Sequence, residues 1–349
     1  MKKMLILFLS ICIVLSMTAC SDTSNKSPQA SDDVTASDNS EVNADNESKS
    51  SAERPEVSMM LVNGFAAIGA VNMFEENEKG TAQNKYDITL ATAPDEVSAK
   101  VLSGEVDIAS IPTNMAATLY NRSEGQVAIA AVNTLGVVQL ISSDDTIQSL
   151  DDLKSREVYG CGQGAIPEYT FEYILAANGI DTATDINIEY KSGHEEVSSL
   201  MSSGQIEIAT IPQPLATKVL EKNSDARIVI DLTEEWNKLD TGAIISQGCV
   251  VIQRSLIEDN QEAVANFLED YERSCNAVHS DLETTAQLCE KFDVLDAATA
   301  LKAIPEANQV FISGQEMQDG LEPFFEILFE ANPQAVGGDL PDDGFYYIP

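Results

Sequence analysis

The sequence of 349 residues predicts an α/β protein with two units of similar plan, each a mostly parallel sheet flanked by helices, and a helical C-terminal segment. Two observations carry this prediction. First, short apolar runs bounded by turn residues alternate with helix-like segments, which is typical of parallel sheets with βαβ crossovers. Second, residues 96–119 align without a gap with residues 196–219, and ten of the 24 aligned positions are identical. A duplicated plan accounts for both.

The first unit opens with an apolar run that ends at Asn63-Gly64, a dipeptide typical of tight turns. A helix is expected from there to Phe74. Pro94 and Pro112 each begin a further helix, because proline suits the first helical turn, where its missing N–H would have no partner. Strands are expected at residues 57–62, 88–91, 106–111 and within 127–141, and the two later helices at 94–104 and 112–120.

The second unit repeats this order after residue 153. Strands are expected at residues 157–160, 186–190, 206–211 and 227–232, and helices at 165–177, 195–203 and 212–221. In each copy of the repeat a helix ends at a glycine, an alternating strand follows, and Ile-Pro leads into the next helix. From residue 255 to 330 the pattern is almost wholly helical, with apolar residues at Val264, Phe267, Leu268 and Tyr271.

The N-terminus has the pattern of an export signal. Residues 1–19 combine Lys2-Lys3 with an apolar run that is too short for a permanent membrane span. Residues 17–20, Met-Thr-Ala-Cys, resemble the lipobox of bacterial lipoproteins, in which the cysteine, here Cys20, is acylated; an ordinary signal peptide cut nearby is the alternative. Residues 20–56 are rich in serine and acidic residues, so we expect a disordered tether, or a processed pro-segment. The chain is therefore expected to be lipid-anchored on the outer, extracellular or periplasmic, face of the cell membrane.

Composition and missing motifs exclude several classes of function. A formal charge of −37 repels phosphate backbones, so nucleic-acid binding is not expected. The sequence has no G-x-S-x-G, H-E-x-x-H or Walker motif, so we expect no enzyme, no catalytic residue and no cofactor. With two histidines and no C-x-x-C pair, no metal site is expected either. Export permits disulfides, and the four cysteines Cys161, Cys249, Cys275 and Cys289 allow three fully paired connectivities. We favour a Cys275–Cys289 pair, with four free thiols as the alternative.

Polar and small residues follow the predicted strands, at the carboxyl edge where open α/β sheets bind ligands. Asn and Gln side chains there can fix a polar solute without net charge, and a phenyl ring can form a flat wall. Helix capping is the alternative role for Thr113, and core packing for Phe65. The candidate ligand-binding residues at these places are Asn63, Gly64, Phe65, Thr113, Asn114 and Gln213.

A glycine-rich loop follows the strand at residues 157–160. Gly162, Gln163 and Gly164 let a ligand approach the backbone, and the N–H groups that open the next helix attract a carboxylate, sulfonate or other polar head. The loop also matches a loose form of the dinucleotide-binding motif, G-x-G-x-x-A. A plain tight turn is the third interpretation. We favour a small-ligand loop, since an exported chain would have to capture a nucleotide outside the cell. Trp236, the only tryptophan, is a candidate stacking platform, although packing is the commoner role.

Four stretches carry a family resemblance. They read PDEVSAKVLSGEVDIASIPTNMAATLYN from Pro94, GCGQGAIPEYTFEYILAANGID from Gly160, SGQIEIATIPQPLATKVL from Ser203 and NPQAVGGDLPDDGFYYIP from Asn332. These residues resemble the solute-binding lipoproteins of bacterial ABC importers, in the branch with alkanesulfonate, nitrate and thiamine-pyrimidine-precursor binders. One departure is Gln213, which stands where such proteins commonly have a glutamate.

The resemblance implies a periplasmic-binding-protein-like fold of type II, with lobe 1 at residues 57–140 and 249–349 and lobe 2 at 141–248. It implies chain crossings near residues 139–142 and 248–253. It also implies a monomer that captures a small-molecule solute between its lobes and delivers it to an ABC permease in the membrane. We lean to a thiamine-type pyrimidine precursor, with an organosulfonate or other small anion as the alternative. A lipid-anchored enzyme, or a sensory or adhesion module, would reuse the same fold.

Overall fold

The computed structural model describes residues 54–160, 162–191 and 193–349. The predicted export signal, Cys20 and most of the predicted tether lie outside these residues. The first strand begins at Glu56, one residue before the predicted start, and Arg54 Nη1 donates to Ala82 O at 3.0 Å.

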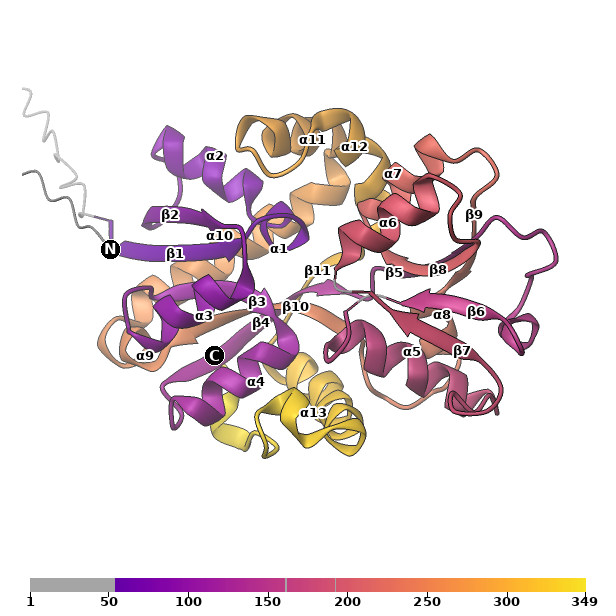
Figure 1. The fold of residues 1–349 in the computed structure, drawn as a ribbon. Coiled ribbons are helices and arrows are strands. Elements are labelled where there is room, and N and C mark those ends of the chain that lie inside the picture. The colour runs from indigo at the N-terminus through magenta and orange to yellow at the C-terminus, as the bar shows by residue number, and fades with distance from the viewer. Residues whose placement is uncertain (1–53, 161, 192) are drawn as a thin grey trace, which may run out of the picture. The chain divides into compact units, whose positions relative to one another are not determined.

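Two sheets form the framework (Figure 1). The first has the order β11-β4-β10-β3-β1-β2 and the second the order β7-β6-β8-β5-β9. The strands of the first sheet are β1 (Glu56–Val62), β2 (Lys85–Ala91), β3 (Ile108–Pro112), β4 (Val127–Leu135), β10 (Ser246–Gln253) and β11 (Gln309–Ser313). Those of the second are β5 (Val138–Ser142), β6 (Glu157–Gly160), β7 (Asn187–Tyr190), β8 (Ile208–Pro212) and β9 (Arg227–Asp231).

Both sheets share one plan, as the sequence predicts. In the first, β2, β1 and β3 are parallel and β10 joins β3 antiparallel. In the second, β7, β6 and β8 are parallel and β5 joins β8 antiparallel. Even the register corresponds, because Pro112 at the end of one repeat pairs with Gly248, and Pro212 at the end of the other pairs with Val138.

The chain crosses between the sheets earlier than expected. The residues expected to cross, 139–142 and 248–253, lie inside β5 and β10, and the links are Gly136-Val137 and residues 238–245. An apolar run marks a buried strand but does not show which sheet the strand joins, which explains the error. Gly136 is required at the first link, because a Cβ there would lie 2.2 Å from Thr233 Oγ1.

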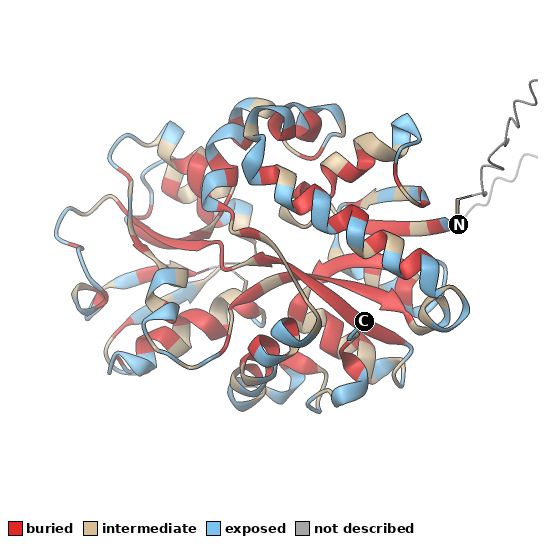
Figure 2. Ribbon diagram, turned by 180° about the vertical axis from the view of Figure 1, so that it is seen from behind, coloured by how far each residue is buried: buried red, intermediate tan, exposed pale blue. Residues whose placement is uncertain are grey.

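Helices cover both faces of each sheet, and their buried sides face the strands (Figure 2). The helices of the first unit are α1 (Phe65–Ile68), α2 (Val71–Lys79), α3 (Pro94–Leu102) and α4 (Thr113–Arg122). Those of the second are α5 (Ile166–Ala177), α6 (His194–Ser202), α7 (Leu215–Lys222) and α8 (Leu232–Asn237), with a 3-10 turn η1 (Leu150–Leu153). Alternate strand residues enter different cores: Met59 and Leu61 pack with α1, α2 and α10 (Gln261–Ser280), whereas Met60 packs with α3, α4 and α13 (Gly314–Ala331).

The C-terminal segment is helical except for β11, a strand of five residues that lies within the stretch expected to be almost wholly helical. Its remaining elements are α9 (Arg254–Asp259), α11 (Leu282–Lys291), α12 (Ala297–Ala303) and the 3-10 turns η2 (Ile304–Glu306), η3 (Pro333–Val336) and η4 (Asp343–Phe345). In the described part of the chain, no helix has the length and apolar character needed to span a membrane.

Candidate functional site

The carboxyl ends of the parallel strands in both sheets point into one region of the molecule. Figure 1 shows the arrowheads of β1 and β6 directed toward the space between the two sheets. The loops that follow these strands hold most of the predicted site residues. Open parallel sheets bind ligands at this edge, where the loops that lead from each strand into the following helix collect.

The loop after β1 is fixed by its asparagine. Asn63 Nδ2 donates to Asp293 O at 3.0 Å, and Asn63 Oδ1 accepts from Gly64 N at 2.8 Å. Gly64 has φ 105° and ψ −142°, a conformation that side chains disfavour, and no atom lies within 4 Å of a Cβ built there. Phe65 is half-buried against the core beneath α1. The three predicted residues thus form one turn, and the side-chain amide of Asn63 already has hydrogen-bond partners within the protein.

A buried polar network supports this turn from below. Ser110 Oγ donates to Ala66 O in α1 at 3.1 Å, and Asn133 Nδ2 donates to Ser110 Oγ at 2.7 Å and to Tyr271 Oη at 2.9 Å. Gln309 is also buried and its Nε2 donates to Thr134 Oγ1 at 3.1 Å. This network ties the turn to β3, β4, α10 and β11, so the turn is held from several elements at once.

Thr113 and Asn114 both make hydrogen bonds within the protein. Thr113 is fully buried, and its Oγ1 shares a hydrogen bond of 2.6 Å with Ser246 Oγ at the start of β10. Asn114 Nδ2 donates to Ala335 O at 3.3 Å in η3. Both residues therefore hold neighbouring segments in place, and their direct contact with a solute is not supported.

Gln213 is also committed inside the protein. Its Nε2 donates to Gln139 Oε1 at 3.1 Å, and its Oε1 accepts from Thr217 Oγ1 at 2.7 Å. The residue is 3% exposed. The polar side chain therefore fixes the start of α7 to the crossing strand β5, rather than facing solvent.

Trp236 is a core residue, so the stacking role considered for it is not supported. It is 1% exposed, its Nε1 donates to Ala243 O at 2.7 Å, and its ring packs against Tyr173 and Phe324. Because Phe324 belongs to α13, this contact joins the second unit to the C-terminal segment.

The glycine-rich loop keeps the predicted backbone but has a partner of its own. Gly162 and Gly164 both have φ 74°, which explains the choice of glycine at these two places. Gln163 is exposed. Gly164 N donates to Glu168 Oε2, a carboxylate oxygen from the first turn of α5. The predicted attraction of this helix start for a negative group is therefore met within the chain.

Tyr190 is a residue that the sequence reading missed. It ends β7 opposite Gly160, and a Cβ at Gly160 would lie 2.4 Å from its ring, so only glycine admits the ring there. Tyr190 Oη donates to Glu172 Oε1 at 3.1 Å. Burial raises the pKa of Glu172, and the bond from Tyr190 partly opposes this rise. Glycine at the end of a strand was the available signal, since it often marks a close approach.

His194 is a second residue that was missed. It begins α6 directly after the loop that follows β7, and its Nδ1 is buried with no hydrogen-bond partner in the part of the chain that the structure describes. Burial lowers its pKa, while the nearby Glu195 opposes this effect. A neutral imidazole with an unsatisfied ring nitrogen can donate to or accept from a bound solute.

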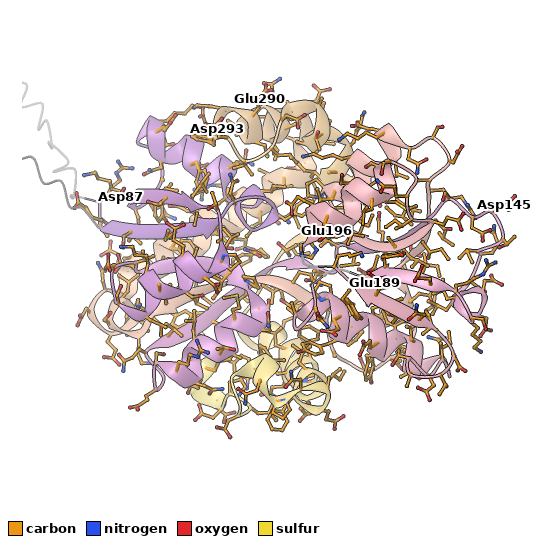
Figure 3. The ribbon with its side chains drawn as sticks, in the orientation of Figure 1. Asp87, Asp145, Glu189, Glu196, Glu290 and Asp293 are labelled. Carbon is orange, nitrogen blue, oxygen red and sulfur yellow. The ribbon has the colours of Figure 1, made fainter. Side chains whose placement is uncertain are left out.

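The charges near these loops are mostly negative. Lys191 is hydrogen-bonded to Glu189 and its Nζ lies 5.2 Å from the centre of the Tyr159 ring. Figure 3 places Glu189 and Glu196 near the end of the second sheet that faces the first. Within the described residues, no group of three or more His, Cys, Asp or Glu could hold a metal ion.

Three cysteines, Cys249, Cys275 and Cys289, are free and buried, so a Cys275–Cys289 disulfide is wrong for this structure. Cys275 Sγ instead donates to Gly69 O at 3.6 Å. Burial raises the pKa of Cys249 and of Cys289 to about 12, which keeps both as thiols. Cys161 lies outside the described residues.

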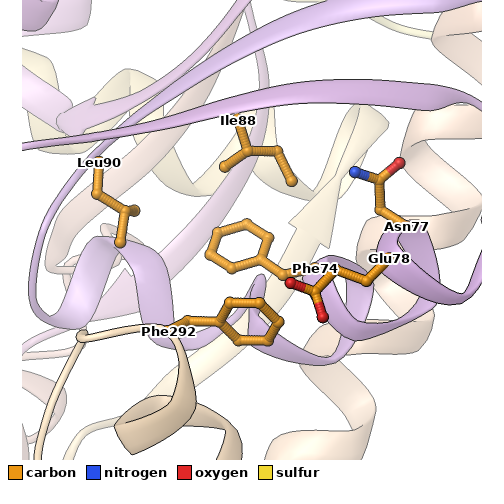
Figure 4. Close-up of a pocket in the computed structure, with 6 residues that line it drawn as sticks. All are labelled: Phe74, Asn77, Glu78, Ile88, Leu90 and Phe292. Carbon is orange, nitrogen blue, oxygen red and sulfur yellow. The ribbon is translucent and has the colours of Figure 1, made fainter.

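A separate cavity of about 280 Å³ lies beside the edge strand β2 (Figure 4). Phe74 and Phe292 meet edge to face there, with ring centres 5.4 Å apart. Its other lining residues are Asn77, Glu78, Ile88 and Leu90. None of the predicted site residues contributes to this cavity.

Comparison with known proteins identifies relatives of one kind. Residues 78–300 match the family described as "ABC transporter, phosphonate, periplasmic substrate-binding protein". The chain is 22% identical over 221 residues to a Bacillus subtilis (strain 168) protein named "Putative binding protein YtlA". That alignment covers 60% of this chain and 62% of the relative, so it spans under two thirds of the relative's length.

Solved structures share the fold. An ABC transporter protein from Parabacteroides distasonis has a TM-score of 0.70 at 22% identity, covering 85% of this chain and 99% of that one. The periplasmic aliphatic sulphonate binding protein SsuA from Escherichia coli has a TM-score of 0.63 at 15% identity, covering 80% and 94%. The periplasmic nitrate-binding protein NrtA from Synechocystis PCC 6803 has a TM-score of 0.52 at 11% identity, covering 76% and 75%.

Proposed function

Because this chain belongs to the family of ABC-transporter, phosphonate, periplasmic substrate-binding proteins, we propose that it is the solute-binding subunit of an ABC import system. The observation that supports the proposal is the shared plan of the two sheets. Their strand ends bring the loops at Asn63–Phe65 and Gly162–Gly164 toward the same region (Figure 1). Loops from two sheets can enclose a small solute on opposite sides.

In this proposal the lobes follow the sheets. Lobe 1 contains β1–β4 and everything from β10 onward, and lobe 2 contains β5–β9. The links at Gly136-Val137 and residues 238–245 act as the hinge, since a few connecting residues can absorb domain closure. The closed form is recognised by a membrane permease, and the solute favours that form by binding it more tightly than the open one.

We propose a lipid anchor at Cys20 and a monomer on the outer face of the cell membrane. The lipobox-like residues and the acidic, serine-rich segment after them support the anchor. The solute is released chemically unchanged, so mass spectrometry of the protein incubated with a bound solute should recover that solute intact.

For the solute itself, a thiamine-type aminopyrimidine is our first candidate. The groups at the strand ends include the exposed Gln163 amide, backbone groups and the half-buried Phe65 ring, which suit a polar heterocycle. Organosulfonates and other small anions form the second candidate class, since structural neighbours are named for sulphonate and nitrate binding.

Thermal unfolding of the full chain with a solute panel tests this proposal. The panel holds the pyrimidine precursor of thiamine, ethanesulfonate, methylphosphonate and nitrate, each at 100 times an expected Kd of about 10 µM. A specific ligand at that ratio stabilises the folded state by about 2.7 kcal/mol, which raises Tm by several degrees. The absence of any shift, in this panel and in a wider metabolite screen, would contradict the function.

A further inference from the structure

The helix start that the sequence offers to an anion is filled by the protein's own carboxylate. Glu168 lies in the first turn of α5, a helix of 12 residues, and its Oε2 accepts the hydrogen bond from Gly164 N. Anionic ligands bind helix starts because backbone N–H groups and the helix dipole favour negative charge there. An external phosphonate or sulfonate would have to displace Glu168 and then bear its repulsion.

The backbone around this carboxylate gives little else to an anion. Ala165 N is bonded to Gly162 O at 3.0 Å, and Pro167 has no N–H to give. In the second turn of the same helix Glu172 adds another carboxyl group, which is bonded to Tyr190 Oη. At this loop the N–H groups of Gly164 and Ala165 thus have partners within the chain, and two carboxyl groups lie in the first two turns of the helix that follows.

Cations that would offset these carboxylates are scarce. The stretches considered run from each parallel strand end through the third residue of the following helix. Among the described residues of these stretches, Lys191 is the one Lys or Arg, and it is bonded to Glu189. The same stretches contain five acidic residues besides: Asp95, Glu96, Glu168, Glu195 and Glu196. An anion would therefore enter a region of negative potential.

Acceptors for a donor-rich solute are present instead. Glu168 has a second carboxylate oxygen, Oε1, and the buried Nδ1 of His194 has no hydrogen-bond partner among the described residues. A carboxylate bonded to a charged or amine donor gives a stronger hydrogen bond than a neutral pair. The two groups lie at the starts of α5 and α6, the helices that follow the adjacent strands β6 and β7.

We infer that the solute held at this edge presents N–H donors or a positive charge to Glu168, and that this carboxylate excludes phosphonates and sulfonates. This inference rests on the proposed function, because it assumes that the strand ends of the two sheets hold the solute. The inference means that this chain does not bind phosphonates, although the description of its family names phosphonate.

The test is isothermal titration of the full chain and three variants with ethanesulfonate and methylphosphonate at constant ionic strength. Glu168→Ala opens Gly164 N, whereas Glu168→Gln keeps an acceptor oxygen for that N–H and removes only the charge. The control is Glu290→Gln, which removes an exposed carboxylate on α11 that is distant from Glu168 in the sequence (Figure 3). Circular dichroism confirms that each variant is folded.

We expect no measurable anion binding by the wild-type chain or Glu290→Gln, and at least tenfold tighter anion binding by Glu168→Ala. The aminopyrimidine should lose at least tenfold in affinity on Glu168→Gln. Two results would overturn the inference: anion binding by the wild-type chain as tight as by Glu168→Ala, or no gain in that variant. Anion binding by the wild-type chain would overturn this inference but would still support solute capture. If Glu168→Ala gains anion affinity while no solute is found for the wild-type chain, the result counts against the proposed function and not against the inference.

Discussion

Asp270 is a fully buried carboxylate with a complete set of partners. Its Oδ2 accepts from Tyr86 Oη and Gln83 N, both at 2.9 Å, and its Oδ1 accepts from Arg273 Nη2 at 2.6 Å. Burial and the nearby Asp270 raise the pKa of Tyr86 far above its usual value, so the phenol stays a donor. This cluster fastens α10 to the edge strand β2.

Replacing Asp270 by alanine should therefore lower the free energy of unfolding by about 3 kcal/mol or more, because Tyr86 and Arg273 lose a buried partner. Urea denaturation measures this loss. Asp87→Ala, on the exposed side of β2 (Figure 3), is the control and should change the value by less than about 0.5 kcal/mol. An equal loss of unfolding free energy in Asp270→Ala and Asp87→Ala would contradict a specific contribution from the cluster.

At this scale the sequence did not predict where the side chains point. Thr113 and Gln213 do follow repeated strands, yet both turn inward to bond Ser246 and Gln139. A polar residue at a helix start serves equally well as an internal tie or a ligand contact, so residue type alone could not decide. His194 and Tyr190 were missed because their roles depend on burial and on the neighbouring strand.

Among the elements, α5 and β7 are joined through Tyr190, whose ring covers Gly160 and whose hydroxyl bonds Glu172. A raised carboxyl pKa means that the folded chain holds the proton of Glu172 more tightly than the unfolded chain. The stability from this group is therefore present below its unfolded pKa and is lost as pH rises through the folded pKa.

Glu172→Gln should consequently leave Tm unchanged at pH 4 and raise it at pH 8, since glutamine keeps an acceptor for Tyr190 and carries no charge to bury. Differential scanning calorimetry at the two pH values measures this. Glu290→Gln, which is exposed, should show no such pH dependence. A lower Tm for Glu172→Gln at pH 8 would mean that the ionised form is the stabilising one.

Most elements could be predicted because local signals agree with the fold. Proline opens α3, and the two repeats give matching strands β3 and β8. The crossings could not be placed, since β4, β5 and β10 are all buried apolar runs. Only pairing between distant strands decides which sheet each of them joins. β11 could not be placed because it lies within a stretch whose pattern is almost wholly helical.

On the scale of the whole described chain, several contacts connect the proposed lobes besides the hinge, and two of them differ in burial. Trp236 meets Phe324 of α13 with ring centres 6.0 Å apart, and Lys302 of α12 is paired with Glu221 of α7. The first contact is buried and the second is exposed, so the exposed pair is the weaker restraint on relative movement.

Hydrogen exchange with and without the solute that raises Tm most tests the central claim directly. The account predicts slower exchange at Asn63–Phe65 in the first sheet and at Gly162–Gly164 and His194 in the second, and no change around Phe74 and Phe292. Slower exchange confined to the cavity at Phe74 and Phe292, or to the loops of one sheet alone, would contradict capture between two lobes.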